Sequence, residues 1–409
     1  MKITLTQFRP NTAEAVWTDC FAQAIAELHK AGGGVLTVPT GEYSTGPIEL
    51  CSNMELHLEP GAVIRFLNDP AAFPLQECQY EGRISHRPKP CLSAFNAENV
   101  ALTGFGVLDG CGAPWWAAQR ARTLANGRPY LLHFENVTHL RVCGVQLRNS
   151  PAWTVHPLNC VDVLIEDVSI CNPYNPPNTD GINPESCRDV RILNCRVDVG
   201  DDCITLKSGT EETPSPVPCE NIVIANCLLV HGHGGIVIGS EMSGGVRNVT
   251  VTNCVFTVTD RGLRDKTRRR RGGCVENLRL SNLVMERVFC PFVFNMYYSC
   301  GTAEKDRWVW EKTPYTVDGG TPAFRNIRIN GVTVVGATAS AGFFYGLAES
   351  PIDGLSLTDC HIEMARGAAP EKPAMMGNLE PMSARGFFLR NAKNVEFHNV
   401  TLKNADGEA

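Results

Sequence analysis

A short pattern that recurs along the chain constrains its fold more than any other feature. Each copy begins with a polar or small residue, continues with alternating apolar positions, and reaches Asn, Asp or Gly five residues after its start. The copies begin at Asn99, His139, Asp162, Asp189, Asn221, Asn248, Asn277, Asn326, Gly354 and Asn394. Neighbouring starts are most often about 27 residues apart, and the longer intervals carry insertions. A period of this length indicates a repeat fold.

The alternation inside each copy is a β-strand signal, because the side chains of a strand point in turn to its two faces. No long helical pattern separates the copies, so a β-solenoid fits better than alternating strands and helices. Asn, Asp and Gly at the recurring turn tolerate a left-handed backbone. Four of these turn residues precede a cysteine that we expect inside the coils as a small apolar side chain: Cys195, Cys227, Cys254 and Cys360.

The N-terminal region has a different pattern. Residues 18–30 predict an amphipathic helix that is capped by Thr18 or Asp19, ends at Gly32, and covers the open end of the solenoid. Its predicted apolar face consists of Phe21, Ala24, Ile25 and Leu28. No linker is visible, so we expect a single domain over 1–409, with a cap region over about 1–45 and coils with loop insertions over about 46–405.

Composition excludes several classes of partner. The chain has 409 residues, 43% of them hydrophobic, and a formal net charge of −6, which argues against nucleic acid or a membrane as its partner. No apolar leader follows Met1. We therefore expect a cytoplasmic protein whose 18 cysteines are mostly reduced; the alternative is a secreted protein whose signal has been removed. The sequence does not indicate an oligomeric state.

Four segments align by their own alternation and gather charged residues. They span 180–186, 202–208, 234–240 and 262–267, and they place Ile182, Ile204, Ile236 and Leu263 at one inward position. Strands on successive coils stack about 4.8 Å apart. The alignment therefore predicts one face that carries three carboxylates, one histidine and two cations: Asp180, Asp201, Asp202, His233, Arg264 and Lys266.

Crowded carboxylates raise one another's pKa, a cost that catalytic sites accept when one acid must be protonated while another is ionised. Glycoside hydrolysis needs such a pair, an acid for the leaving oxygen and a base for water. The two cations would hold the carboxylate of an acidic sugar. The predicted partner is therefore an acidic oligo- or polysaccharide.

The aligned segments resemble the signature motifs of the polygalacturonase family of glycoside hydrolases. The motifs are Asn178-Thr-Asp-Gly181, Gly200-Asp-Asp-Cys203, Gly232-His-Gly234 and Arg264-x-Lys266. Each motif is weak alone, but four in order are specific, and the resemblance covers nearly the whole chain. It implies an all-β fold, a right-handed parallel β-helix, and inverting hydrolysis of α-1,4-galacturonosidic bonds. It also implies no cofactor and no metal, and it is strongest to bacterial exo-acting members.

The resemblance also implies a role for each site residue. Asp201 would be the general acid, Asp180 and Asp202 would hold and deprotonate the attacking water, and His233 would tune the acid. The residues expected to bind galacturonate are Asn178, Arg264, Lys266 and Tyr297. Rhamnogalacturonan hydrolases of this kind typically lack the His and Arg-x-Lys motifs, so their presence favours a galacturonan substrate. The resemblance leaves open whether Cys203 and Cys219 form a disulfide.

The sequence departs from the family pattern at two positions. Asp265 stands between Arg264 and Lys266 where the family has an apolar residue, and the alignment places it inward. There it would pair with a neighbour, force a bulge, or remain a costly unpaired carboxyl. Arg270 replaces a glycine and makes 268–271 an unbroken run of arginines, for which we expect contact with the acidic polymer.

Several alternatives remain open at this point. A β-helix pectate lyase with calcium on the aspartates would leave Gly232-His-Gly234 unexplained. A rhamnogalacturonan or xylogalacturonan hydrolase is a variant, and Asp265 makes an impaired or non-catalytic pectin-binding solenoid a further one. Exo and endo action are not separated, although insertions near 70–95 and 300–320 are candidates to close one end of a cleft. Trp115-Trp116 and Trp153 to His156 fit sugar platforms or plain packing equally well.

Overall fold

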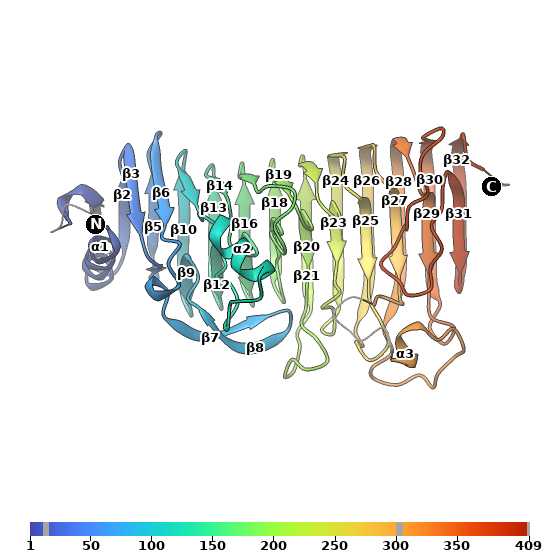
Figure 1. Cartoon of the computed structure of the whole chain (residues 1–409), viewed down its shortest axis with the longest axis horizontal. Helices are drawn as coiled ribbons and strands as arrows, with labels where there is room; N and C mark the ends of the chain where they lie inside the picture. Colours follow the sequence, from blue (N-terminus) through green and yellow to red (C-terminus); the bar gives the residue numbers. More distant parts are fainter. Residues whose placement is uncertain (11–15, 300–305, 407–409) are drawn as a thin grey trace. The chain divides into compact units, whose positions relative to one another are not determined.

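The computed structural model describes residues 1–10, 16–299 and 306–406. These form two compact units, Met1–Asp201 and Asp202–Ala409, each of which is described by itself. Both are built almost entirely of parallel strands, and each is a stack of coils of a right-handed parallel β-helix (Figure 1). The all-β class and the β-helix architecture expected from the repeats are confirmed.

The first unit contains three parallel ladders. One runs through β1 (Lys2–Thr4), β2 (Gly34–Val38), β5 (Met54–Leu58), β10 (Glu98–Gly104), β13 (Thr138–Cys143), β16 (Val161–Glu166) and β18 (Arg188–Leu193). A second runs through β3 (Gly41–Thr45), β6 (Ala62–Phe66), β11 (Val107–Asp109), β14 (Gln146–Arg148), β17 (Ser169–Cys171) and β19 (Arg196–Val199). The third consists of β4 (Ile48–Leu50), β9 (Leu92–Phe95), β12 (Leu132–Glu135) and β15 (Val155–Leu158).

The second unit is described by two parallel ladders, and most strands of the first of these are longer than those of the first unit. One ladder runs through β21 (Cys219–Ala225), β24 (Val246–Thr257), β26 (Cys274–Glu286), β28 (Ala323–Ala337), β30 (Ile352–Met364) and β32 (Ala392–Lys403), and β22 (Leu228–His231) pairs with the second half of β24. The other consists of β20 (Ile204–Leu206), β23 (Ile236–Ile238), β25 (Arg261–Lys266), β27 (Cys290–Asn295), β29 (Ser340–Tyr345) and β31 (Arg385–Arg390).

The recurring pattern marks two left-handed corners in every coil. All the pattern starts, and all the residues five positions later, have a positive φ. Asparagines at these corners also bond between coils: Asn277 Nδ2 donates to Asn248 Oδ1 at 3.0 Å, and Asn282 Nδ2 donates to Asn253 Oδ1 at 2.8 Å. The cysteines expected to lie inside the coils are buried, so that prediction is confirmed.

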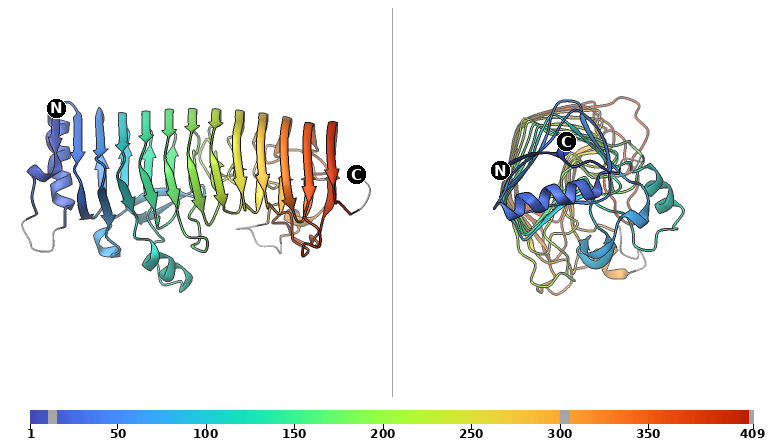
Figure 2. Two further views of the ribbon diagram at one scale, coloured as in Figure 1. Left: turned by 90° about the horizontal axis from the view of Figure 1, so that it is seen from above. Right: turned by 90° about the vertical axis from the view of Figure 1, so that its left-hand side faces the viewer.

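The N-terminal helix α1 (Thr18–Lys30) has the predicted bounds and buries Phe21, Ala24, Ile25 and Leu28. It lies across the end of the first unit's coils (Figure 2). The predicted cap is wrong: the N-cap residue is Trp17, and no side chain caps the helix. Thr18 Oγ1 instead accepts a hydrogen bond from Gly46 N at 2.7 Å, which links the helix to the coil.

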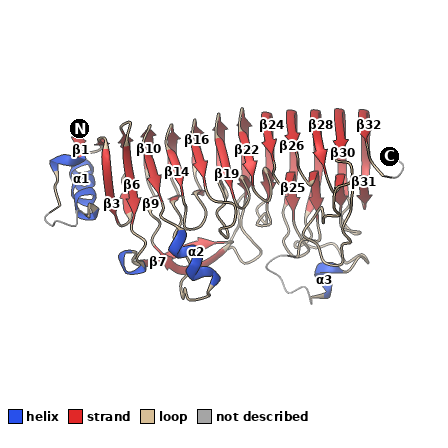
Figure 3. Cartoon of the chain, turned by 45° about the horizontal axis from the view of Figure 1, so that its top comes forward, coloured by secondary structure: helices blue, strands red, loops and turns tan. Residues whose placement is uncertain are grey.

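The remaining elements are inserted between coils and are drawn in Figure 3. The first unit carries an antiparallel hairpin, β7 (Leu75–Tyr80) with β8 (Arg83–Pro88), and the helix α2 (Ala113–Arg120). The second unit carries the short helix α3 (Arg307–Trp310). Two further pieces are the 3₁₀ turns η1 (Leu5–Gln7) and η2 (Pro70–Ala72). None of the helices in the described part of the chain is long and apolar enough to span a membrane.

Candidate functional site

Asp202 is clamped between the two predicted cations. Its Oδ1 accepts from Arg264 Nη1 at 2.8 Å and its Oδ2 accepts from Lys266 Nζ at 2.7 Å. The register of β20, β23 and β25 aligns Ile204 with Ile236 and Leu263, as the sequence alignment required. Side chains alternate along β25, so Arg264 and Lys266 both point away from the coil interior. Gly234 leaves room for the clamp, since a Cβ there would lie 3.2 Å from Asp202 Oδ1.

The clamp keeps Asp202 ionised. The side chain is buried, and burial alone would raise the pKa of this carboxyl. The positive charges of Lys266 and Arg264 outweigh that effect and hold the pKa of Asp202 well below its usual range. Both oxygens of Asp202 face cations, so the carboxylate is held as a fixed negative charge.

A second buried ion pair lies behind the clamp. Lys207 Nζ and Glu241 Oε2 are 2.6 Å apart. Burial would raise the pKa of Glu241, but the charge of Lys207 outweighs it and lowers this pKa to about 2. Lys207 also contributes to the lowered pKa of Asp202. Sequence reasoning missed this pair, although Lys207 follows the inward Leu206 and therefore shares the outward face of its strand.

His233 is oriented by a carboxylate that the sequence analysis did not single out. Its Nδ1 lies 2.8 Å from Asp260 Oδ2, and 45% of its side-chain surface is exposed. Asp260 Oδ2 also accepts from Arg261 Nη1 at 3.3 Å. A carboxylate beside Nδ1 assigns the proton to that nitrogen and fixes the ring plane. His233 is thus a partly exposed imidazole in a set orientation.

The first unit carries Asn178, Asp180 and Asp201. Asp180 is buried, and its Oδ2 accepts from Asn183 Nδ2 at 3.1 Å. Asn178 has a left-handed backbone, and its Oδ1 accepts from Nη2 of the buried Arg128 at 2.8 Å. Arg128 therefore fixes the Asn178 side chain, a role that no motif signalled. Asp201 is partly exposed and is joined to Asp202 by a peptide bond.

Tyr297, for which galacturonate binding is expected, is a buried residue in the structure. It is 1% exposed, and Lys312 Nζ lies 3.4 Å from the centre of its ring. The neighbouring Tyr298 instead has its ring centre 5.4 Å from Lys266 Nζ. After β27, Tyr297 N donates to Asn295 Oδ1 at 2.9 Å, and the Tyr297 ring packs edge-on against Tyr345 with the ring centres 5.0 Å apart. The aromatic residue beside the cations is therefore Tyr298.

Asp265 faces the interior, as predicted, and the register shows no bulge: it pairs with Ile238 on one side and Phe294 on the other. It lies with apolar side chains at a small cavity, and its buried Oδ2 has no hydrogen-bond partner. Burial raises the pKa of Asp265 well above its usual range and so favours the protonated carboxyl. Arg264 and Lys266 point away from the interior and pair with Asp202. Neither of them therefore forms an ion pair with Asp265.

Most arginines of the run at 268–271 form ion pairs with glutamates of other loops. Arg268 and Arg271 both pair with Glu211. Arg269 binds both oxygens of Glu349 and donates to the carbonyls of residues 308, 311 and 313. Arg270 is exposed and stacks 4.3 Å over the Trp308 ring. Three members of the run are thus held in ion pairs with Glu211 and Glu349, and contact of the run with the polymer stays a prediction.

The tryptophans that fitted either packing or sugar binding are packed. Trp115 and Trp153 are each 2% exposed. Trp116 is buried and donates from Nε1 to the carbonyl of Ser150 at 2.9 Å. His156 is fully buried, 3.0 Å from Glu185 Oε2. None of these rings presents a face to solvent on which a sugar could stack.

Comparison with known proteins places these residues in a family context. The family model described as "Glycosyl hydrolases family 28" matches residues 36–369. A probable polygalacturonase of Vitis vinifera is 34% identical over 287 residues, covering 67% of this chain and 58% of the relative. An endo-polygalacturonase of Pectobacterium carotovorum subsp. carotovorum is 30% identical over 272 residues, with 63% and 65% covered. The chain thus spans less than two thirds of the length of these two curated relatives.

One solved structure is similar over almost the full length. The hyperthermoactive exopolygalacturonase from Thermotoga maritima superposes with a TM-score of 0.81 at 29% identity. The match covers 99% of this chain and 92% of that one. The likeness extends from the first coils to the last and includes the segments that carry the clamp and its neighbours.

Proposed function

Because the chain belongs to glycosyl hydrolases family 28, we propose that it hydrolyses α-1,4-galacturonosidic bonds of homogalacturonan or oligogalacturonides, with inversion at the anomeric carbon and from a chain end. The observation that carries the proposal is the clamp, in which Arg264 and Lys266 hold Asp202 as a buried anion. A base that stays ionised at acidic pH, with two cations beside it, suits hydrolysis of a polymer of acidic sugars.

In this proposal the acid and the base are different aspartates. Asp201 protonates the glycosidic oxygen as the bond to the leaving sugar breaks, and Asp202 with Asp180 takes a proton from water as it attacks the anomeric carbon. The partly exposed Asp201 is reachable by a substrate, whereas the buried Asp202 is shielded from solvent. His233, held by Asp260, supports the acid and contacts the sugar.

Lys266 has donors left for a sugar carboxylate, and one donor of Arg264 contacts only a weak acceptor. Lys266 carries three N–H groups, and among the residues that the structure describes it donates one hydrogen bond, to Asp202. Arg264 Nη2 lies 2.8 Å from the thioether of Met375, a weak acceptor that a carboxylate would replace with a gain in energy. In the bound state both cations would then bridge Asp202 and the galacturonate.

Exo action is supported by the similarity to the Thermotoga maritima exopolygalacturonase and by the loops at 306–322 and 365–384 in the second unit. Such insertions restrict where a polymer can extend. The endo-acting relative from Pectobacterium carotovorum keeps the opposite mode open to test.

The test is incubation with trigalacturonate and with polygalacturonate in the presence of a chelator, followed by anion-exchange chromatography. We expect galacturonate as the sole early product, and none from Asp201→Asn. Mixed oligomers would replace exo with endo action, and an unsaturated, ultraviolet-absorbing product would replace hydrolysis with β-elimination. If neither the wild type nor Asp265→Ile releases any product, the galacturonan assignment is wrong.

A further inference from the structure

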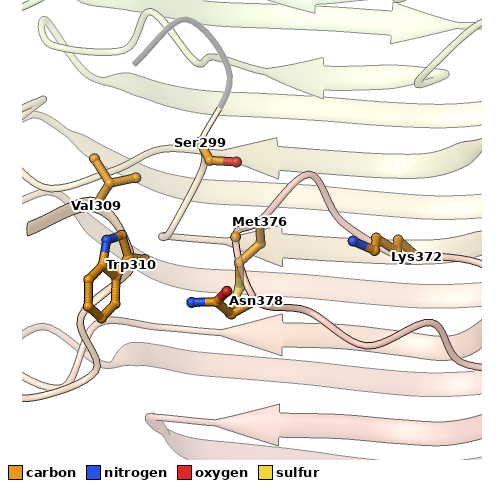
Figure 4. Close-up of a pocket in the computed structure, with 7 residues that line it drawn as sticks. Ser299, Val309, Trp310, Lys372, Met376 and Asn378 are labelled. Carbon is orange, nitrogen blue, oxygen red and sulfur yellow. The ribbon is translucent and has the colours of Figure 1, made fainter. Parts of the chain in front are cut away.

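A pocket in the second unit lies beside the clamp and has no role in the proposed reaction. It is lined by Ser299, Val309, Trp310, Lys372, Met376 and Asn378, together with the backbone of Gly377 (Figure 4). Its cavity volume is about 220 Å³. In Figure 4 the Lys372 side chain points from its loop toward Met376, and Trp310 lies on the opposite side.

The pocket adjoins the cations through two contacts. Met376 forms a β-bridge with Tyr298, whose ring lies 5.4 Å from Lys266 Nζ. The preceding Met375 touches Arg264 Nη2 with its sulfur. A sugar chain held at Arg264 and Lys266 would therefore reach the pocket with the neighbouring residue.

Both walls of the pocket are anchored to the chain segment that carries the clamp. Arg261 donates to the carbonyls of Lys372 and Pro373, each at 3.0 Å, and so holds the 371–382 loop. Arg269 donates to three carbonyls of the 308–313 segment and so holds the wall with Trp310. The pocket is thus pre-formed, which lowers the entropy lost when a ligand binds.

The lining groups fit an acidic sugar. Lys372 makes no salt bridge with any residue that the structure describes, although it faces the pocket. Trp310 is 36% exposed and lines the pocket with its indole, and Asn378 supplies amide donors and an acceptor for hydroxyl groups. An unpaired cation, an exposed indole and an amide around one pocket are the groups that recognise a carboxylated pyranose.

We infer that this pocket is an additional subsite that binds a second uronate residue of the substrate, with Lys372 as the residue that selects its free carboxylate over an ester. The inference rests on the proposed function for its substrate class. The subsite contributes to binding and chain-length preference, and it takes no part in bond cleavage.

The test compares wild type, Lys372→Met and Lys372→Arg on di-, tri- and tetragalacturonate. We expect Lys372→Met to lower the ratio of kcat/KM for tetragalacturonate over digalacturonate about tenfold, through KM and not through kcat. Lys372→Arg restores most of the ratio because it keeps the charge. Lys403→Ala, an exposed lysine on β32, is the matched control and leaves the ratio unchanged.

Two outcomes would overturn the inference. An unchanged ratio would mean that the pocket holds no sugar, and an equal loss on all chain lengths would mean that Lys372 acts on the cleavage site itself. If the wild type cleaves no galacturonan, the proposed function fails separately. Calorimetric titration with trigalacturonate then tests the pocket directly: binding that weakens about tenfold in Lys372→Met supports the subsite, and equal or absent binding rejects it.

Discussion

The two sides of the coil at strand β25 treat a buried aspartate in opposite ways. On the outer side, Asp202 is 2% exposed and lies between Arg264 and Lys266. On the inner side, Asp265 is 4% exposed and lies among apolar side chains with one oxygen unpaired. The surroundings lower the pKa of the first carboxyl and raise that of the second.

The comparison shows that partners, and not burial, decide the charge of a buried carboxyl. Both groups lose their water to a similar extent. For Asp202, two cations at hydrogen-bond distance offset the desolvation cost of the charged carboxylate. Asp265 has no such cations, so burial favours its protonated form, which costs less to desolvate. Strand β25 thus carries Arg264 and Lys266, the partners of the Asp202 carboxylate, on its outer side. On its inner side it carries Asp265, whose raised pKa favours the neutral acid.

The largest expected effect comes from removing the charge of Asp202. Asp202→Asn should lower kcat on trigalacturonate about 1,000-fold, because the base is lost and two cations are left without their anion. The measurement is initial rate by anion-exchange chromatography. Asp162→Asn is the matched control, since this surface carboxylate pairs with Arg191 at a corner where asparagine fits. A loss of less than tenfold in Asp202→Asn would remove Asp202 from the mechanism.

Weakening the clamp should raise the pKa of Asp202. In Lys266→Met the remaining Arg264 no longer outweighs burial as strongly, so the carboxylate takes up a proton at higher pH. The acid limb of the kcat profile should move to higher pH by about one unit, which is a tenfold lower rate on that limb. Lys393→Met, which removes an exposed lysine on β32, is the comparison variant. An acid limb that stays in place would show that another group controls it.

On the inner side, Asp265→Ile should stabilise the protein at pH 7 by about 2 kcal/mol, since an unsatisfied buried polar group is removed. The pKa of Asp265 is raised in the folded state. The part of its destabilisation that is linked to protonation is therefore absent below the unfolded pKa of about 4 and grows as the pH rises. The gain measured by urea unfolding should therefore shrink between pH 7 and pH 4. A gain independent of pH would mean that Asp265 is ionised in the fold.

The smallest effect is expected for Asp265→Asn. The amide keeps the shape and the polarity of the protonated acid, so the free energy of unfolding at pH 4 should change by less than about 1 kcal/mol. The dependence of the free energy of unfolding on pH should change, because an amide cannot release a proton in the unfolded chain. Urea unfolding at several pH values would show a flatter stability profile than the wild type. A profile as steep as that of the wild type would assign the pH dependence to other groups.

The sequence analysis predicted the coils well because their pattern is local. The residue types that tolerate a left-handed backbone occur at fixed intervals, and each of them adopts that conformation. Strand alternation then set which side chains face inward, including Ile204, Ile236 and Asp265. It failed at the α1 cap, where Thr18 bonds to a coil distant in sequence. It also did not single out Tyr298, whose ring lies beside Lys266.

By itself, the sequence determined the repeat, the inward and outward faces, and the motif residues, because these depend on neighbours a few positions apart. Only the tertiary structure decided which partners those residues meet. Met375 reaches Arg264 from a loop more than 100 residues away, and Arg268 and Arg271 form ion pairs with Glu211. A residue's charge and availability depend on such distant contacts, which no local pattern encodes.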